Sequence, residues 1–141
     1  MKALRDEFLA PGEVKFAYRH MAFLGPESIL AAEASECAAE QAQFLPYHDL
    51  IFQTQGAENS GVFTVDKLVS LADQIGLDQS RFRSCLVSHK YKTVVEESTQ
   101  QAKDIGVRGT PTILINGRLV QDPSNLAAMR KIILEELALN P

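Results

Sequence analysis

The chain has 141 residues, of which 45% are hydrophobic and 23% are charged, and its formal net charge is -4 at pH 7. This length and composition are typical of one globular domain with a core of its own. The acidic balance argues against a nucleic-acid partner, and no apolar stretch is long enough to span a bilayer. The opening residues, MKALRDEF, lack the apolar segment of a secretory signal, so none is expected here.

The N-terminal part of the sequence predicts a short helix followed by a strand. An apolar pair one helical turn apart indicates a helix over residues 2–9, which Pro11 ends. Residues 13–19 then alternate apolar and polar side chains, which is the two-residue period of a β-strand. The alternation predicts that Phe16 and Tyr18 lie in the core.

The middle of the chain predicts a block of helices. Gly25 and Pro26 open the first of them, because proline favours the first turn of a helix. Thr64 and Asp78 are suited to cap two later helices. The other predicted helices cover residues 27–43, 44–55 and 89–105.

A β-hairpin and a final helix complete the predicted elements. Residues 112–115 form an apolar run rich in β-branched side chains, and the Asn-Gly pair that follows favours a tight turn into a second strand at residues 118–121. Asp122 and Pro123 are suited to begin a helix whose apolar residues recur at helical spacing. The order of elements is that of an α/β protein with a helical insertion.

Four segments, taken in this order, resemble the DsbA-like thiol–disulfide oxidoreductases, which have a thioredoxin fold with an inserted helical subdomain. They are GEVKFAYRHMAF (residues 12–23), AAEASECAAEQAQFLPYHDLIF (31–52), IGLDQSRFRSCL (75–86) and GVRGTPTILINGR (106–118). The resemblance implies one α/β, thioredoxin-like domain over residues 1–141, with the helical insertion at about residues 26–105. It also implies disulfide exchange with exported proteins in an extracytoplasmic or periplasmic compartment. Because this chain shows no signal, a cytoplasmic location stays open.

The stretch GVRGTPT places a proline just before the first strand of the hairpin. Taken alone, Pro111 suits a trans proline at the start of an edge strand, since proline cannot donate to a sheet ladder. In the resembling family this X–Pro bond is cis, and the loop pairs with the main chain of extended substrate segments. The resemblance therefore implies that Gly109, Thr110 and Pro111 bind substrate, with Gly109 allowing a close approach of the backbone.

The family's reactive Cys-x-x-Cys, which begins a helix after the first strand, does not occur in this sequence. Residues 1–9 resemble the end of that helix. We therefore expect an N-terminally truncated domain with no catalytic residue and no exchange activity of its own. The strand that precedes the helix is central in the family's sheet, so we expect either that the sheet closes the gap directly or that a second copy covers it in a homodimer. A membrane redox partner is implied only for the intact parent.

The sequence contains two cysteines, Cys37 and Cys85, and their spacing does not decide their state. They are either two buried thiols or one long-range disulfide, and a redox-active pair is a third alternative. The resemblance implies a structural disulfide away from the active site. Such a bond suits the oxidising compartment that an export-type family implies.

The remaining candidate residues favour structural roles. His20 is expected at a partly exposed strand end, His48 within the helical block and His89 at a helix start. Histidines so scattered predict no metal site, and no cofactor is expected. Two other functions stay open beside disulfide exchange. One is a non-catalytic module that binds extended peptides, and the other is an enzyme similar to glutathione transferase kappa and hydroxychromene carboxylate isomerase.

Overall fold

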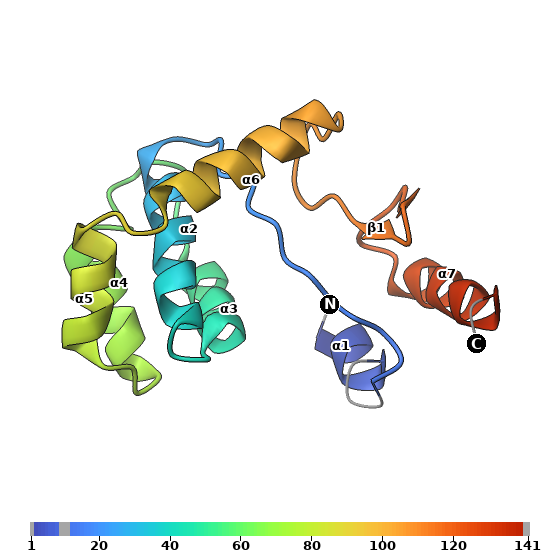
Figure 1. Ribbon diagram of the computed structural model, residues 1–141, viewed down its shortest axis with the longest axis horizontal. Coiled ribbons are helices and arrows are strands. Elements are labelled where there is room, and N and C mark those ends of the chain that lie inside the picture. The colour runs from blue at the N-terminus through green and yellow to red at the C-terminus, as the bar shows by residue number, and fades with distance from the viewer. Residues whose placement is uncertain (1, 9–11, 140–141) are drawn as a thin grey trace. The chain divides into compact units, whose positions relative to one another are not determined.

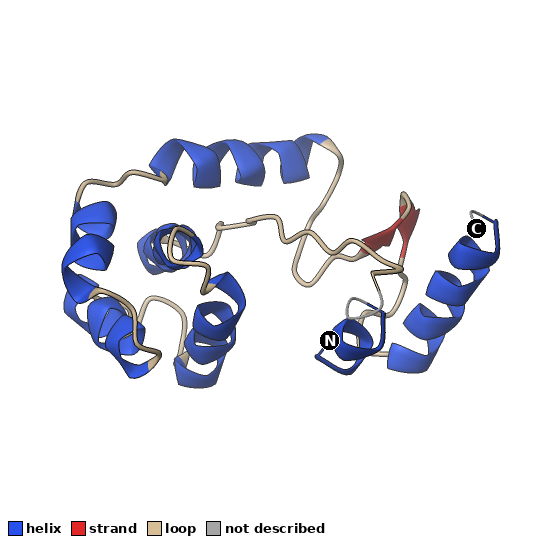
Figure 2. Ribbon diagram, turned by 60° about the horizontal axis from the view of Figure 1, so that its bottom comes forward, coloured by secondary structure: helices blue, strands red, loops and turns tan. Residues whose placement is uncertain are grey.

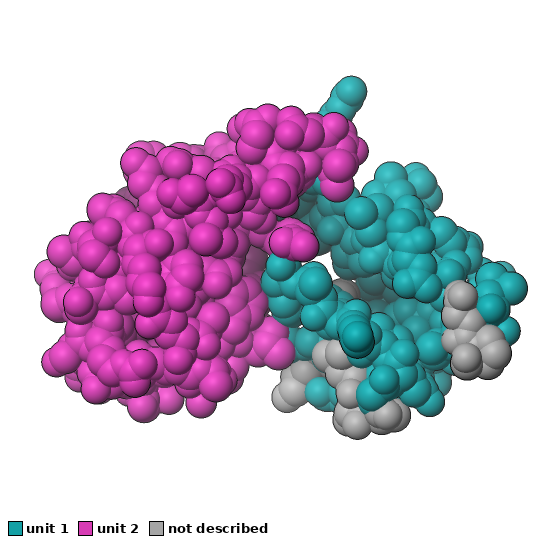
Figure 3. All heavy atoms as spheres, in the orientation of Figure 1, with its two compact units in different colours: residues 1–18, 107–141 teal, residues 19–106 magenta. Residues whose placement is uncertain are grey.

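The computed structural model describes residues 2–8 and 12–139, and these fall into two compact units. The terminal unit comprises residues 1–18 and 107–141, and the helical unit comprises residues 19–106 (Figure 3). Each unit has a hydrophobic core of its own. Within the described ranges, no helix combines the length and the apolar character that crossing a membrane requires.

Five helices form the helical unit, all of whose residues are described, and α2 is the helix that the others surround (Figure 1). They are α2 (Pro26–Ala39), α3 (Phe44–Thr54), α4 (Val65–Gln74), α5 (Gln79–Val87) and α6 (Lys92–Asp104). α2 packs against each of the other four. Its buried side includes Ala31, Ala34 and Ala38, whose small side chains let the neighbouring helices approach closely.

The capping residues predicted for α4 and α5 are confirmed. The Thr64 hydroxyl accepts a hydrogen bond from the Lys67 N–H at 3.2 Å, and the Asp78 carboxylate accepts one from the Arg81 N–H at 2.9 Å. Each satisfies one of the backbone donors that the first turn of a helix leaves unpaired. α6 begins at Lys92, later than predicted, because His89 has a φ of 51°, which an α-helix does not allow.

The segment that leads into the helical unit is bonded to α6, the helix that leaves it. The Ser98 hydroxyl donates to the carbonyl of His20 at 3.1 Å, and the Ala22 N–H donates to the Thr99 hydroxyl at 3.0 Å. Ser98 and Thr99 are both buried. These two bonds hold the first and last parts of the helical unit side by side.

The described residues of the terminal unit form two helices and a β-hairpin, whose strands are red in Figure 2. Its elements are α1 (Lys2–Phe8), β1 (Leu114–Ile115), β2 (Arg118–Leu119) and α7 (Leu126–Leu139). The strands pair antiparallel with Leu114 opposite Leu119 and Ile115 opposite Arg118. The core of the unit is formed by buried side chains from α1, α7 and the segment just after β2: Leu4, Phe8, Val120 and Met129.

The hairpin predicted from the Asn-Gly pair is confirmed, although its strands are shorter than expected. Asn116 and Gly117 have φ values of 48° and 83°, and a two-residue turn with positive φ at both positions matches the twist of the paired strands. The Val120 N–H donates to the Ile113 carbonyl at 2.9 Å, which continues the pairing beyond the two residues assigned to each strand.

The strand predicted at residues 13–19 is wrong. These residues are in none of the helices and strands of the structure, and the Val14 N–H donates to the Phe8 carbonyl at 3.3 Å instead of to a neighbouring strand. A strand needs a partner at about 4.8 Å, which alternation in the sequence cannot supply. The expectation that the sheet closes the gap directly is therefore also wrong. Phe16 is 38% exposed, so it does not take the core position predicted for it.

The start of the final helix also differs from the prediction. The Asp122 carboxylate accepts hydrogen bonds from the N–H of Ser124 at 3.0 Å and from its hydroxyl at 2.5 Å, so Asp122 forms a turn ahead of the helix. The Asn125 side-chain oxygen accepts from the Ala128 N–H at 2.9 Å and caps α7. Asn and Asp both suit either role, and the sequence does not distinguish them.

Candidate functional site

The loop of residues 109–112, which we call the 109–112 loop, lies between the end of α6 and β1. Its Thr110-Pro111 peptide bond is cis, as the resemblance implies. The Thr112 hydroxyl donates a hydrogen bond to the carbonyl of Gly109 at 2.7 Å and so closes the loop on itself. Thr110, Pro111 and Thr112 are exposed, which leaves the loop open to an approaching chain.

The structure gives no steric reason for a glycine at position 109. A Cβ built on Gly109 would meet no atom within 4 Å, and Gly109 is not among the residues with positive φ. The packing of this chain therefore does not require glycine at position 109, and a close approach of a substrate backbone there stays a prediction. Gly106, with a φ of 82°, is the glycine whose backbone conformation the turn after α6 requires.

The hairpin beyond the loop exposes one of its faces. Ile113 and Ile115 pack on the core around Met129, and because side chains alternate along a strand, Leu114 points to the opposite face. Leu114 and its partner Leu119 are 49% and 53% exposed. In the described part of the chain the sheet has two strands, so β1 pairs through one edge only. The hairpin thus combines an unpaired backbone edge with an apolar surface.

The second candidate feature is a disulfide between Cys37 on α2 and Cys85 on α5, with a Cα–Cα distance of 5.9 Å. Of the alternatives that the sequence left open, the structure thus has the disulfide rather than two thiols. The bond links the two helices within the core of the helical unit. Because the sequence has no other cysteine, no thiol is free to act as a nucleophile in this state.

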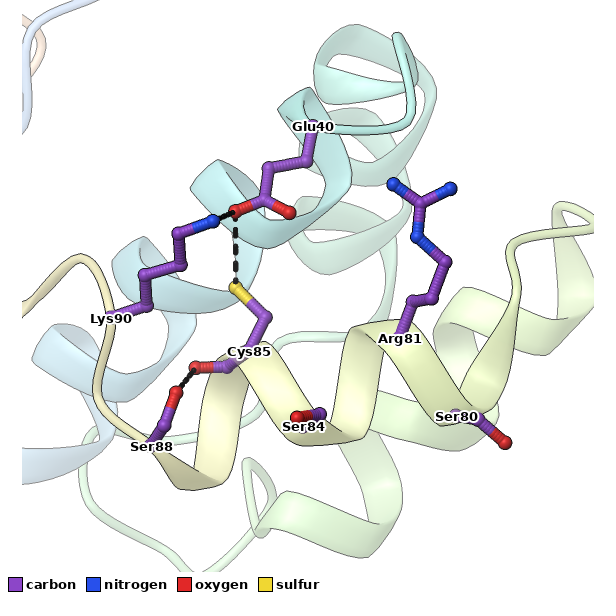
Figure 4. Close-up of a pocket in the computed structure, with 7 residues that line it drawn as sticks. All are labelled: Glu40, Ser80, Arg81, Ser84, Cys85, Ser88 and Lys90. Atoms are coloured by element: carbon purple, nitrogen blue, oxygen red, sulfur yellow. Dashed lines mark hydrogen bonds and ion pairs between the residues drawn. The ribbon is translucent and has the colours of Figure 1, made fainter.

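A pocket of about 440 Å³ lies beside Cys85, and we call it the Cys85 pocket (Figure 4). It is lined by residues of α5, the turn that follows it and the end of α2: Ser80, Arg81, Ser84, Cys85, Ser88, Lys90 and Glu40. None of these except Cys85 was singled out from the sequence. In the sequence, positions 81, 84, 85 and 88 recur at helical spacing, which could have indicated that they share one face of a helix. This spacing does not reveal Glu40 or Lys90, because they meet α5 only in the folded chain.

Glu40 is the electrostatic centre of the Cys85 pocket. Its carboxylate forms an ion pair with Lys90 and accepts a hydrogen bond from the Tyr91 hydroxyl at 2.8 Å. The hydrogen bonds from Lys90 and Tyr91 hold the pKa of Glu40 below its usual value. The hydrogen bond to Glu40, together with partial burial, raises the pKa of Tyr91 to about 12. The carboxylate is therefore ionised and engaged on two sides at neutral pH.

The three histidines pair with separate carboxylates. His20 contacts Glu36 at 2.6 Å, and its side chain is 14% exposed, so it is partly exposed as predicted, although no strand precedes it. His89 contacts the buried Glu33 at 3.1 Å from a turn rather than from a helix start. Among the described residues, no three His, Cys, Asp or Glu side chains come together in a group that could hold a metal ion.

Comparison with known proteins identifies the family. The sequence model of the family described as Thioredoxin matches residues 1–135. Two relatives named probable disulfide bond formation protein D, from Bacillus cereus and Bacillus anthracis, are 28% and 27% identical over 95% of this chain. The chain is a DsbA-like member of the thioredoxin family. The crystal structure of oxidised BdbD from Bacillus subtilis superposes on this DsbA-like chain with a TM-score of 0.88 at 23% identity. The match covers 98% of this chain and 76% of the BdbD chain. The predicted thioredoxin-like fold is thus confirmed.

Relatives of the DsbA-like chain are longer proteins. This DsbA-like chain spans 63% of the length of the Bacillus cereus protein. A third relative, the Na(+)/H(+) antiporter NhaA 3 of Salinispora tropica, is 30% identical over 96% of this chain, which amounts to 20% of the antiporter. The same kind of domain therefore occurs in proteins of different size and name. These relatives do not favour the glutathione transferase kappa-like enzyme or the non-catalytic module as alternatives.

Proposed function

We propose that this chain is the substrate-binding part of a DsbA-like thiol–disulfide oxidoreductase that acts on exported proteins. The observation that carries the proposal is the 109–112 loop. Its residues Thr110, Pro111 and Thr112 are exposed, and it leads directly into the edge of β1 that has no partner strand among the described residues. An extended peptide can add to such an edge through main-chain hydrogen bonds. Gly109, Thr110 and Pro111 are then the residues that receive the substrate backbone. The relatives named for disulfide bond formation support the same reaction class.

The reactive dithiol of the proposed enzyme lies outside these residues. The chain has no Cys-x-x-Cys, and its two cysteines are joined to each other. Disulfide exchange starts with attack by a thiolate, so the chain by itself lacks the group that begins the reaction. The part that supplies the Cys-x-x-Cys completes the site, while residues 1–141 form one domain with the helical unit as an insertion.

The proposal extends to location and partners. An enzyme that forms disulfides works where they persist, so we place it in an extracytoplasmic compartment, with extended segments of exported proteins as substrates and a membrane protein as the partner that reoxidises the intact enzyme. The exposed Leu114 and Leu119 and the unpaired edge of β1 support pairing of two hairpins in a homodimer when the chain is alone.

The reaction is tested with two forms of the protein. One is the chain as given, and the other is the chain extended by the codons that lie upstream in frame, provided that they encode a Cys-x-x-Cys. The extended form is expected to oxidise a peptide that carries two thiols, whereas the chain alone is expected to show no turnover. Turnover by the chain alone at the rate of the extended form, or an upstream frame without the motif, would overturn the proposal.

The loop is tested in the extended form by Thr112→Val, which removes the hydroxyl that bonds to Gly109 but keeps the shape of the side chain. The rate of peptide oxidation is expected to fall, and Thr112→Ser, which retains a hydroxyl, is the matched control.

The homodimer is tested by analytical ultracentrifugation of the chain alone. A monomer at every concentration would contradict it, and Leu119→Lys is expected to weaken the dimer.

A further inference from the structure

The Cys37–Cys85 disulfide is accessible from one side only. Cys37 is 1% exposed and lies within the core of the helical unit, whereas Cys85 is 7% exposed and lines the Cys85 pocket. Figure 4 shows the Cys85 sulfur on the side of α5 that carries the Arg81 side chain and faces Glu40 and Lys90. A small molecule in the pocket therefore meets the sulfur of Cys85, and the sulfur of Cys37 is shielded behind it.

The charges around this sulfur favour an anion. Lys90 and Arg81 bring two positive charges to the pocket, and Glu40 brings one negative charge. The Glu40 carboxylate lies 3.9 Å from the Cys85 sulfur, but it is already engaged by Lys90 and Tyr91. The positive charge of Arg81 acts on Glu40, but its guanidinium forms no ion pair within the described ranges, so its N–H donors are available to a ligand.

We propose that Cys85 is a site of S-thiolation, at which a small thiol that also carries a carboxylate or sulfonate binds in the Cys85 pocket and opens the disulfide. The acid group of the ligand pairs with Arg81, whereas Lys90 stays paired with Glu40 and offsets the negative charge of that carboxylate. The three serine hydroxyls that line the pocket, from Ser80, Ser84 and Ser88, make the surroundings polar.

The exchange is balanced and needs no oxidant. The thiolate sulfur of the ligand forms a bond to the sulfur of Cys85, and the bond between Cys85 and Cys37 breaks. The electron pair of that bond goes to the sulfur of Cys37, which takes a proton from water and becomes a buried thiol. The products are a mixed disulfide at Cys85 and a free thiol at Cys37, so one disulfide replaces another.

Regioselectivity and charge preference are the two measurable consequences. The oxidised chain is treated with 3-mercaptopropionate, which is anionic, 2-mercaptoethanol, which is neutral, or cysteamine, which is cationic. Excess N-ethylmaleimide in urea at mildly acidic pH stops the reaction and reaches the otherwise buried Cys37 thiol, and mass spectrometry of the peptides locates the adducts. The small thiol is expected on Cys85 and the maleimide on Cys37. Each rate is divided by the rate of the same thiolate with a small neutral disulfide, which removes differences in intrinsic nucleophilicity. On this scale 3-mercaptopropionate is expected to react about threefold faster than cysteamine at low ionic strength, and salt is expected to reduce this difference.

Arg81→Gln tests the ligand's charge contact without touching the disulfide. It is expected to slow the reaction with 3-mercaptopropionate by about threefold and to slow that with 2-mercaptoethanol less, because 2-mercaptoethanol carries only the charge of its thiolate. The control is Arg83→Gln, because Arg83 lies on the same helix but pairs with Asp66 at 2.7 Å, away from the Cys85 pocket. This variant removes the same charge from α5 and is expected to leave both rates unchanged.

Three results would overturn the proposal. The first is equal modification of Cys37 and Cys85, which is the result expected if the disulfide opens only when the chain unfolds. The second is a rate that stops rising with thiol concentration at the unfolding rate of the chain, which has the same meaning. The third is an equal loss of rate in Arg81→Gln and Arg83→Gln, which would indicate a general effect of net charge and no binding in the pocket.

Discussion

The hydroxyl of Tyr47 donates a hydrogen bond to the carbonyl of Leu68 at 2.9 Å, and this bond joins α3 to α4 inside the helical unit. Tyr47 is fully buried, and its ring centroid lies 5.1 Å from that of Phe82. Burial raises the pKa of Tyr47, so the hydroxyl remains protonated and available as a donor. A polar group is thus placed in the core without being left unpaired, which is the condition under which such a group is tolerated.

Tyr47→Phe is therefore expected to lower the free energy of unfolding by about 1–2 kcal/mol, because it deletes a buried hydrogen bond while keeping the ring. Urea unfolding followed by circular dichroism measures the change. Tyr91→Phe, which removes a hydroxyl from a less buried position, is the comparison and is expected to cost less. Equal effects for the two variants would indicate that the bond to Leu68 contributes nothing beyond an exposed contact.

Removal of the disulfide is expected to destabilise the chain by roughly 4 kcal/mol in the chain-entropy model, in which the loss grows with loop length. Cys37 and Cys85 are separated by 48 positions in the sequence, so the bond closes a long loop in the unfolded chain. The Cys37→Ala/Cys85→Ala double variant, compared with the oxidised chain by urea unfolding, measures the effect. A loss below about 1 kcal/mol would show that the unfolded chain is not restricted in this way.

Asn125→Ala is expected to lower the stability of the terminal unit by about 1 kcal/mol, because Asn125 caps α7. Asp122→Ala is expected to cost less, since Asp122 bonds to Ser124 ahead of the helix. Thermal unfolding of the two variants provides the comparison. If Asp122→Ala is the more damaging of the two, the turn before α7 matters more than its cap.

At alkaline pH the contact between Tyr91 and Glu40 is expected to weaken. The pKa of Tyr91 is raised from 10.0 in the ordinary case to about 12 in the fold, so the folded chain holds this proton more tightly than the unfolded chain does. The stabilisation is then fully present below pH 10 and is lost as the pH rises to about 12. The free energy of unfolding is measured at intervals from pH 8 to pH 12 for the wild type and for Tyr91→Phe. The difference between the two proteins isolates the contribution of Tyr91. A difference between the two that stays constant across the range would contradict the assignment.

Local signals in the sequence predicted much of this fold. Thr64 and Asp78 cap their helices because a short polar side chain can reach the first-turn N–H groups wherever it precedes a helix. The Asn-Gly turn works in the same way, since both residues accept the positive φ values that it needs. In each case the interacting atoms belong to residues that are close together in the sequence, so a short sequence pattern is enough to predict the interaction.

Features that depend on distant parts of the chain could not be predicted in this way. The alternation of residues 13–19 describes a strand, but only a neighbouring strand can make it one. The Cys85 pocket depends on Glu40 and Lys90, which are separated by 50 positions and meet only after α2 and α5 have packed. Both cases are decided by tertiary contacts that one sequence does not record.

The two hydrogen bonds that tie His20 and Ala22 to Ser98 and Thr99 have a consequence for how such proteins diversify. They join the segment that enters the helical unit to the middle of α6, so residues 20–22 and 98–99 lie side by side. Helices between these two bonded segments can be gained, lost or exchanged without changing the separation of residues 20–22 and 98–99. Selection can therefore reshape residues between these anchors while the remaining backbone keeps its course.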